Sequence, residues 1–306
     1  MRGLAKNTTT LVRHAAQILA AGHPMTLRQL HYAIFSRAEI AYANNAAHYK
    51  QLSRAMTKAR RLYREAELAG RKPSDLAVRP DWMVDETREG EEVSVRKDAE
   101  AYIEAIKRSY RRDNWQDQRF HCEVWSEKAT ILGAIRPVAN EWGLTLRVCH
   151  GFASTGMEQQ VGQLFAGLKR DIVIFYLGDH DPSGHVIEAD IHNRVEQAAG
   201  RDFRMERLAI HAGDIVRFNL PPQAIKSTDS RASSFRKQFG ETAATVELDA
   251  LPPTELRERI VMAVKRLIDM ETWDRQIAIQ QVEFDCISRI GQQFRGLRQK
   301  SVGGEK

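Results

Sequence analysis

Residues 171–184 read Asp-Ile-Val-Ile-Phe-Tyr-Leu-Gly-Asp-His-Asp-Pro-Ser-Gly, and this stretch decides the fold of the second half of the chain. The first seven residues are almost continuously apolar, which is typical of a parallel strand that is covered on both faces. The strand runs directly into a turn that carries Asp179 and Asp181. We therefore expect a buried strand with two carboxylates at its end.

The sequence on both sides of this strand alternates between strand-like and helix-like segments. We expect strands at residues 120–125, 144–149 and 171–177 and near 207–210, with helices at 129–142 and 156–168 between them. Alternation at this spacing predicts an α/β domain with a parallel sheet. Residues 253–299 are predicted to be helical again.

The first 70 residues are predicted to be helical only. Apolar residues recur at helical spacing in residues 7–22, and Thr26-Leu-Arg-Gln29 has the form of a capping box, which starts a second helix that ends near residue 37. A third, basic helix is expected at residues 46–69. Three helices with a short second one resemble a helix-turn-helix or winged-helix unit.

These patterns divide the chain into three parts. Residues 1–75 are expected to form a winged-helix-like DNA-binding domain, and residues 76–115 a linker with a helix at 97–111. Residues 116–306 are expected to form a Rossmann-like parallel-sheet domain with C-terminal helices. The predicted fold class is thus α/β plus all-α.

Carboxylates end two of the predicted strands. Glu127 follows the first strand, and Asp179 and Asp181 follow the third. Sites in parallel α/β sheets form beyond the carboxyl ends of strands, and clustered carboxylates repel one another unless they share a cation. Oxygen ligands of this kind suit Mg²⁺. The alternative is that these acids are solvated turn residues, and Glu123, on the same face of the strand as Glu127, is a competing ligand.

The charge of the chain favours a polyanionic partner. The net charge is +6, and residues 50–64 are rich in basic side chains. Arg54, Lys58 and Arg61 are therefore candidates for contacts with the phosphate backbone of double-stranded DNA, although such runs are also common on solvated helix faces. The sequence has no apolar run of about 18 residues and no signal-peptide core, and its three cysteines have no metal spacing. We expect a cytoplasmic protein without a membrane span.

Two motifs resemble the signatures of the Toprim fold. They are Ser126-Glu-Lys-Ala129 and Gly178-Asp-His-Asp-Pro-Ser-Gly184, with a glycine-containing turn at residues 150–154 between them. The chain is most similar to the family of the A subunit of topoisomerase VI, its meiotic double-strand-break relatives and short stand-alone versions on mobile elements. This resemblance implies that Glu127, Asp179 and Asp181 hold Mg²⁺.

The same resemblance assigns a role to a tyrosine. The family motif Thr-x-Arg-x-apolar-aromatic-Tyr is matched at residues 26–32, except that His31 replaces the aromatic residue. It implies that Tyr32 attacks a DNA phosphodiester with Arg28 as its partner. In the family the tyrosine and the metal come from different subunits, so a homodimer is implied. From the residues alone, Tyr32 reads as a tyrosine at the edge of a helix that packs on a neighbour.

Further candidate DNA contacts are Lys128, which follows the first acid, and Lys226 and Arg231 in a polar loop. A structural loop is an equal alternative for the last two. Asp249 is expected to cap a helix. Strand passage requires a separate GHKL-type ATPase subunit, because no ATP-binding motif is visible. The implied protein is a type IIB topoisomerase-like isomerase associated with the nucleoid.

Two other functions compete with DNA transesterification. One is a Toprim-type nuclease of a mobile element or defence system, in which a metal-activated water replaces Tyr32. The other is a DNA-binding module without catalysis, which binds DNA independently of metal. Whether the cleaved DNA is linked to protein distinguishes the first two.

Overall fold

The computed structural model describes residues 6–37, 39–84, 95, 97–149, 155–225 and 229–303. Its contacts divide the chain into two units, one of Met1–Glu89 and Cys122–Arg266 and the other of Gly90–His121 and Leu267–Lys306. This grouping differs from the ranges expected above, because the C-terminal helix packs against the helix of the expected linker rather than only extending the sheet domain.

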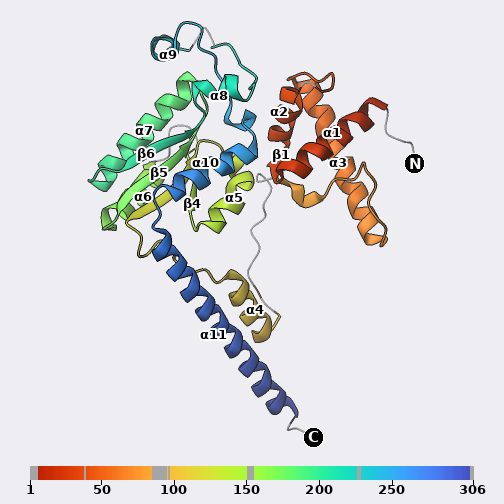
Figure 1. Ribbon diagram of the computed structural model, residues 1–306, viewed down its shortest axis with the longest axis vertical. Helices are drawn as coiled ribbons and strands as arrows, with labels where there is room; N and C mark the ends of the chain where they lie inside the picture. The colour runs from red at the N-terminus through yellow and green to blue at the C-terminus, as the bar shows by residue number, and fades with distance from the viewer. Residues whose placement is uncertain are drawn as a thin grey trace. The chain divides into compact units, whose positions relative to one another are not determined.

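The first unit is built on a four-stranded sheet, shown in Figure 1. The strands are β3 (Phe120–Ser126), β4 (Thr145–Val148), β5 (Asp171–Leu177) and β6 (Arg204–Ala209). Their order is β4-β3-β5-β6, and β3 is parallel to β4 as β5 is to β6. The predicted α/β architecture with a parallel sheet is confirmed.

Helices cover both faces of this sheet, which explains the continuous apolar run of β5. The helices α6 (Thr155–Gly167) and α7 (Pro182–Ala199) pack together, and α5 (Leu132–Glu141) packs against α10 (Pro253–Lys265). Along β5, Ile174 and Tyr176 join the apolar cluster formed with α6 and α7, while Val173 and Phe175 are buried as well. Successive side chains of a strand point to opposite faces, so both faces are buried.

The N-terminal part of the first unit is a three-helix bundle with a core of its own. Its helices are α1 (Lys6–Gly22), α2 (Leu27–Arg37) and α3 (Ala46–Leu68). The predicted capping box is confirmed: the backbone N–H of Gln29 donates to Thr26 Oγ1 over 3.2 Å, and that of Thr26 donates to Gln29 Oε1 over 2.8 Å. A two-residue strand β1 (Met25–Thr26) pairs with β2 (Met83–Val84), after the short helix η1 (Pro80–Trp82).

Several elements lack a strong sequence signal. They are the short helices α8 (Ala212–Arg217), α9 (Ala232–Phe239) and η4 (Leu248–Ala250), as well as η3 (Ala129–Ile131) before α5. A bidentate ion pair of 2.6 Å between Arg259 of α10 and Asp214 ties α8 to α10. Burial alone would raise the pKa of Asp214, but the hydrogen bonds from Arg259 and from the backbone of His211 hold it below its usual value.

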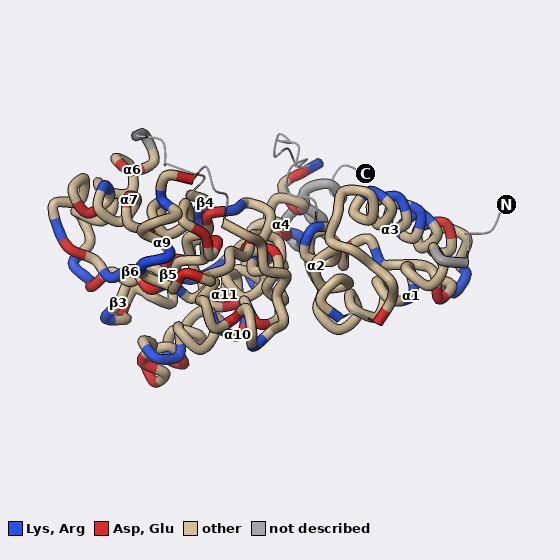
Figure 2. Tube along the Cα trace, turned by 90° about the horizontal axis from the view of Figure 1, so that it is seen from above, with Lys and Arg blue, Asp and Glu red and all other residues tan. Residues whose placement is uncertain are grey.

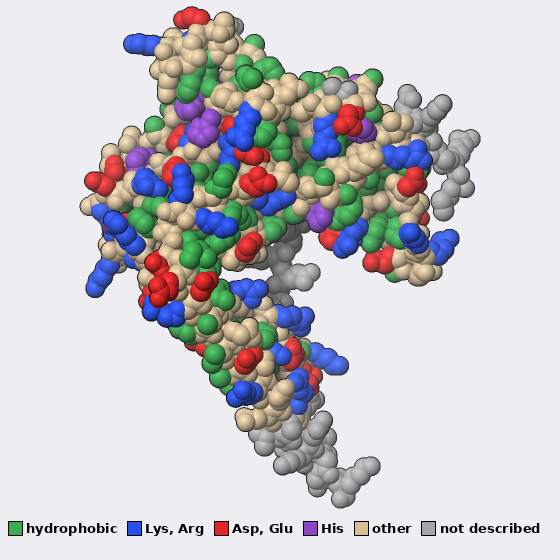
Figure 3. Space-filling model, in the orientation of Figure 1, with side chains coloured by type: hydrophobic (Ala, Val, Ile, Leu, Met, Phe, Trp, Pro, Cys, Tyr) green, Lys and Arg blue, Asp and Glu red, His purple; other side chains and the backbone are tan. Residues whose placement is uncertain are grey.

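The second unit pairs α4 (Ala99–Ser109) with the long helix α11 (Met270–Gly303). Arg112 forms an ion pair with Glu283 over 2.6 Å, and Arg295 forms one with Glu104 over 3.2 Å. Figure 3 shows acidic and basic side chains interspersed along α11. None of the helices in the described part of the chain has the length and apolar character needed to cross a membrane.

Candidate functional site

The strand order places a topological switch point between β3 and β5. The chain goes from β3 to its neighbour β4 on one side, and then returns to β5 on the other side of β3. Ligands bind at such switch points in open α/β sheets, beyond the carboxyl ends of the strands. Glu127 follows β3 and Asp179 follows β5, so the strand order brings these two predicted residues to the switch point.

Glu127 and Asp179 are held together by backbone geometry. The N–H of Glu127 donates to the carbonyl of Leu177 over 2.9 Å, and the N–H of Asp179 donates to Glu127 Oε2 over 3.0 Å. Gly184 closes this corner, because a Cβ added there would lie 2.5 Å from the carbonyl oxygen of Asp179 and 3.1 Å from Glu127 Oε2. Only glycine fits at this position without displacing the two acids.

Lys128 lies among three carboxylates. Its Nζ is 2.8 Å from Asp179 Oδ2, 3.2 Å from Glu247 Oε2 and 3.4 Å from Asp249 Oδ2. We call Glu127, Asp179, Glu247 and Asp249 the acidic cluster. The pKa of Lys128 is raised because these carboxylates outweigh the effect of its burial, so Lys128 stays protonated at neutral pH.

A strand-like contact brings the last two acids to the sheet. His180 and Val246 exchange backbone hydrogen bonds of 2.9 and 3.0 Å, and the N–H of Leu248 donates to Asp179 Oδ1 over 2.7 Å. Asp249 is 1% exposed and accepts a hydrogen bond from Thr130 Oγ1 over 2.9 Å. The expectation that Asp249 caps a helix is wrong, because η4 places it inside the site and α10 begins after Pro252.

Burial and mutual repulsion shape the protonation of the cluster. Burial, followed by the nearby charge of Asp179, raises the pKa of Glu127 to about 7. Burial also raises the pKa of Asp179, although Lys128 opposes the shift. Burial acts in the same direction on Glu247, but Lys128 and Arg28 outweigh it and lower its pKa. A further cation near Glu127 would therefore favour its ionised form.

Asp181 lies at the start of α7 and caps it. Its Oδ1 accepts a hydrogen bond of 2.6 Å from the N–H of Gly184. The charge of Asp181 contributes to the raised pKa of Glu127, so the two carboxylates interact. Asp181 thus stands beside the cluster with one oxygen already engaged.

Two residues of α2 face the acidic cluster from the three-helix bundle. Arg28 forms a hydrogen-bonded ion pair with Glu247, and its Nε is 3.8 Å from Asp249 Oδ2. Tyr32 is 4% exposed, and its phenol lies close enough to Arg28 and Glu247 for their charges to act on it. Burial, followed by the charge of Glu247, raises the pKa of Tyr32, and Arg28 partly offsets this. The motif at residues 26–32 and the acids therefore meet within one chain, whereas the family resemblance implies that they come from different subunits.

Glu123 is engaged elsewhere. It is fully buried, where Arg147 donates two hydrogen bonds of 2.6 and 3.0 Å to its carboxylate and Trp125 Nε1 donates a third of 2.7 Å. It pairs with the first residue of β4, four residues before Glu127 along the chain. The structure therefore gives Glu123 partners of its own, away from the acidic cluster.

The predicted DNA contacts of α3 lie along one exposed face. Arg54, Lys58 and Arg61 line a groove with a volume of about 470 Å³, and Figure 2 shows the basic residues that follow α3. Among the residues that the structure describes, none forms an ion pair with these three. An unpaired row of cations at helical spacing suits a polyanion.

The other two predicted DNA contacts, Lys226 and Arg231, belong to the polar loop before α9. Lys226 lies outside the described residues. Arg231 donates a hydrogen bond of 2.8 Å to Ser183 Oγ at the start of α7. Arg231 thereby ties the segment before α9 to the turn that carries Asp181.

Within the described residues, no three His, Cys, Asp or Glu side chains are already arranged as a set of metal ligands. Lys128 occupies the space between three of the carboxylates. A scan of protein-family models and a search of the curated proteins found no match to this chain.

The sequence did not assign Glu247 and Asp249 to the site. No strand with a clear sequence pattern precedes them. The bridge between His180 and Val246, which places them at the site, consists of long-range backbone hydrogen bonds. The available signal was the density of acids in the segment that follows the polar loop, Glu247-Leu-Asp249.

Gly184→Ala tests the tight corner of the site. We expect a loss of about 1–3 kcal/mol in the free energy of unfolding, because the added methyl group overlaps the Asp179 carbonyl. Gly213→Ala is the matched control, since a Cβ there meets nothing within 4 Å. Urea denaturation at neutral pH measures both; equal stability of the two variants would contradict the described corner.

Proposed function

We propose that this chain is a Mg²⁺-dependent DNA-cleaving enzyme similar to the A subunit of topoisomerase VI. One observation carries the proposal: Arg28 and Tyr32 of the three-helix bundle face acids that converge with Glu127 and Asp179 at the switch point of a parallel sheet. The finer assignments, a winged-helix domain and a Toprim domain, belong to this proposal.

The donor set of the site fits a divalent cation. Glu127 is buried beside Asp179 and has a pKa of about 7. The nearby positive charges therefore do not offset the free-energy cost of burying its ionised form. Asp249 Oδ2 is buried and, within the described residues, has no hydrogen bond, and its nearest cation is the ammonium of Lys128 at 3.4 Å. We propose that Glu127, Asp179 and Asp181 hold Mg²⁺. The ion, when bound, supplies positive charge next to phosphate oxygens.

In the proposed reaction, Tyr32 is the nucleophile. Its phenolic oxygen attacks the phosphorus of a DNA phosphodiester, the bond to the 3′ oxygen breaks, and that oxygen takes up the proton to become a free 3′-hydroxyl. The products are a 5′-phosphotyrosyl link and the free strand end. Arg28 favours the ionised phenol by its charge and offers donors to a phosphate oxygen.

Access to Tyr32 requires a rearrangement. Its exposed fraction is 4%, and Arg28 binds Glu247. A DNA phosphate that competes for Arg28 weakens this ion pair and opens the contact between α2 and η4. We therefore propose that DNA binding uncovers the tyrosine.

The same burial favours a second candidate function, a hydrolytic nuclease in mobile-element or defence biology. Burial raises the pKa of Tyr32, which makes it a poor nucleophile at neutral pH. In this alternative the acids would hold a metal ion that activates water, and Tyr32 remains a structural partner of Arg28. The chemical form of the cleaved DNA end decides between the two.

The proposed partners follow from the charge and from the implied reaction. Double-stranded DNA is the substrate, with α3 on its backbone. Cutting of both strands requires two sites, which a homodimer provides, and strand passage requires a separate ATPase subunit. Association with the nucleoid is the corresponding location.

Cleavage of supercoiled plasmid with Mg²⁺ tests the function. We expect SDS to trap linear DNA that carries protein, visible only after proteinase K digestion, and we expect Tyr32→Phe and Asp179→Asn to abolish it. Tyr63→Phe on α3 is the matched control and retains cleavage. Protein-free cuts that survive Tyr32→Phe but not Asp179→Asn would establish the nuclease instead, and cuts that survive both would reject the site.

The salt dependence of DNA affinity tests the role of α3. Replacement of Arg54, Lys58 and Arg61 by Gln is expected to reduce the slope of log affinity against log salt by about 2–3 for duplex DNA, since each phosphate contact contributes about 0.9. Replacement of Lys169, Lys237 and Lys265 by Gln removes the same charge elsewhere and serves as control. An equal change in slope for both triple variants would leave only a general charge effect.

A further inference from the structure

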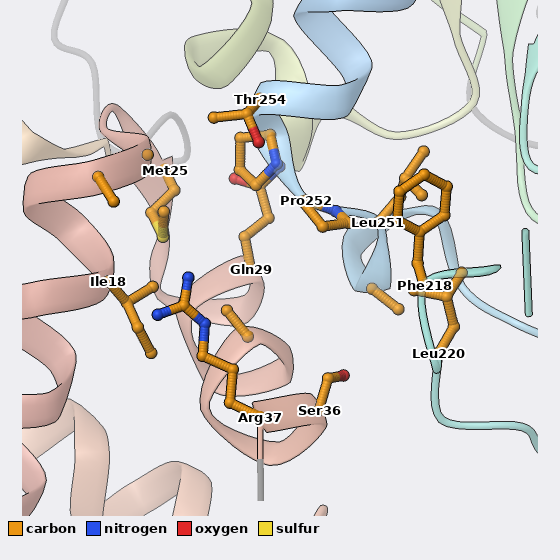
Figure 4. A pocket seen from close by; sticks show the side chains of 15 residues that line it. Ile18, Met25, Gln29, Ser36, Arg37, Phe218, Leu220, Leu251, Pro252 and Thr254 are labelled. Carbon is orange, nitrogen blue, oxygen red and sulfur yellow. The ribbon is translucent and has the colours of Figure 1, made fainter. Parts of the chain in front are cut away.

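A second cavity lies apart from the acidic cluster, within the first unit. It has a volume of about 290 Å³ and is walled by α1 and α2 on one side and by residues 218–220 and 250–254 on the other. Figure 4 shows the apolar side chains of Ile18, Met25, Phe218, Leu220 and Leu251 around it. This volume is close to the lower limit for small-molecule sites, about 300 Å³.

The walls of this cavity are fixed before any ligand arrives. Arg257 of α10 donates hydrogen bonds to the carbonyl of Gly22 over 3.1 Å and to that of Ala134 over 2.9 Å. These bonds join the end of α1 to the start of α10 and to α5. A preformed wall lowers the entropic cost of ligand binding.

Gln29 lines the cavity and carries an unused donor. Its side chain is 1% exposed, and Figure 4 shows it reaching from α2 toward Thr254. The capping box fixes the orientation of the amide, because Oε1 must accept from the N–H of Thr26 over 2.8 Å. Nε2 is therefore the other end, and within the described residues it is buried without a hydrogen-bond partner. A buried amide donor of this kind is costly unless something pairs with it.

Two further polar groups line the same cavity. Ser36 Oγ is buried and also has no hydrogen-bond partner in the described part of the chain. Arg37, the last residue of α2, is exposed, and the described residues give it no ion pair. An amide donor, a hydroxyl and a guanidinium in one cavity together select a hydrogen-bond acceptor that carries negative charge.

We propose that this cavity binds a small monocarboxylic acid with an apolar tail. Gln29, Ser36 and Arg37 receive the carboxylate, and the apolar walls receive the tail. Water alone satisfies the polar groups but gains nothing from walls of Ile, Met, Leu and Phe, whereas a tail removes that surface from water.

Binding at this cavity bears on the acidic cluster through the chain. Gln29 follows Arg28 directly, and Ala250, which lines the cavity, follows Asp249. A ligand that touches both sides strengthens the contact between α2 and η4. We therefore expect the ligand to raise the melting temperature. The inference is independent of the DNA chemistry, since it needs neither metal nor catalysis.

Calorimetric titration of the full chain with octanoate, and with octanamide as its neutral counterpart, tests the proposal. We expect one octanoate per chain. Arg37→Gln should weaken octanoate about tenfold and leave octanamide unchanged, because only the carboxylate uses the charge. Ser36→Ala should weaken both, and Ala33→Phe, which fills the cavity, should abolish both. Arg13→Gln, which removes an exposed arginine of α1 outside the cavity, is the control.

Each outcome of this titration either supports or overturns the proposal. If Ala33→Phe does not fold, the contrast between Arg37→Gln and Arg13→Gln still decides. No binding of either probe at millimolar concentration would mean that the cavity holds only water, and would overturn the proposal. Binding that all three cavity variants leave unchanged would place the probe elsewhere and would overturn it as well.

Discussion

The ammonium group of Lys128 holds together the acidic cluster, and the rest of the site depends on this interaction. Asp179 from the end of β5 and Glu247 and Asp249 from the segment around η4 meet at one place, and each is mostly removed from water. Carboxylates in such proximity repel one another and resist ionisation. A buried cation among them is therefore a condition for this arrangement, and its removal would leave several uncompensated buried charges. For Glu127, the neighbour of Lys128 in sequence, burial and the charge of Asp179 outweigh the favourable charge of Lys128.

Arg28 extends the same charge network to the three-helix bundle. Because it binds Glu247, the helix that carries Tyr32 is tied to the α/β part by an ion pair rather than by apolar packing alone. Tyr32 is buried yet lies outside the apolar core of the bundle, whose members are on the other faces of its helices. An ion pair responds to a competing anion, whereas a packed core does not. In the two proposals above, DNA at Arg28 weakens the contact between α2 and η4, whereas a ligand in the neighbouring cavity strengthens it.

The sequence predicted what depends on local pattern. The apolar run of β5, the alternation of strands and helices and the capping box at Thr26 gave the parallel sheet and the N-terminal helices, because burial on both faces and helix starts leave direct traces in sequence. It placed Glu127 and Asp179 at strand ends, and the strand order then brought them together. It could not foresee Glu247 and Asp249, because a bridge between His180 and Val246 is a long-range contact without periodicity. It also suggested Glu123, whose partner Arg147 is visible only in the paired strands.

Binding of Mn²⁺, a substitute for Mg²⁺ that electron paramagnetic resonance detects, tests the central claim that the switch-point acids form a cation site. The wild-type chain and the variants Glu127→Gln, Asp179→Asn and Glu241→Gln are compared without DNA, so that catalysis plays no part. The account predicts one Mn²⁺ per chain, with affinity weakened by about tenfold or more in the first two variants and unchanged in the third, an exposed glutamate. Equal affinity in all four proteins would contradict it, and the acids would then be only the partners of Lys128 and Arg28.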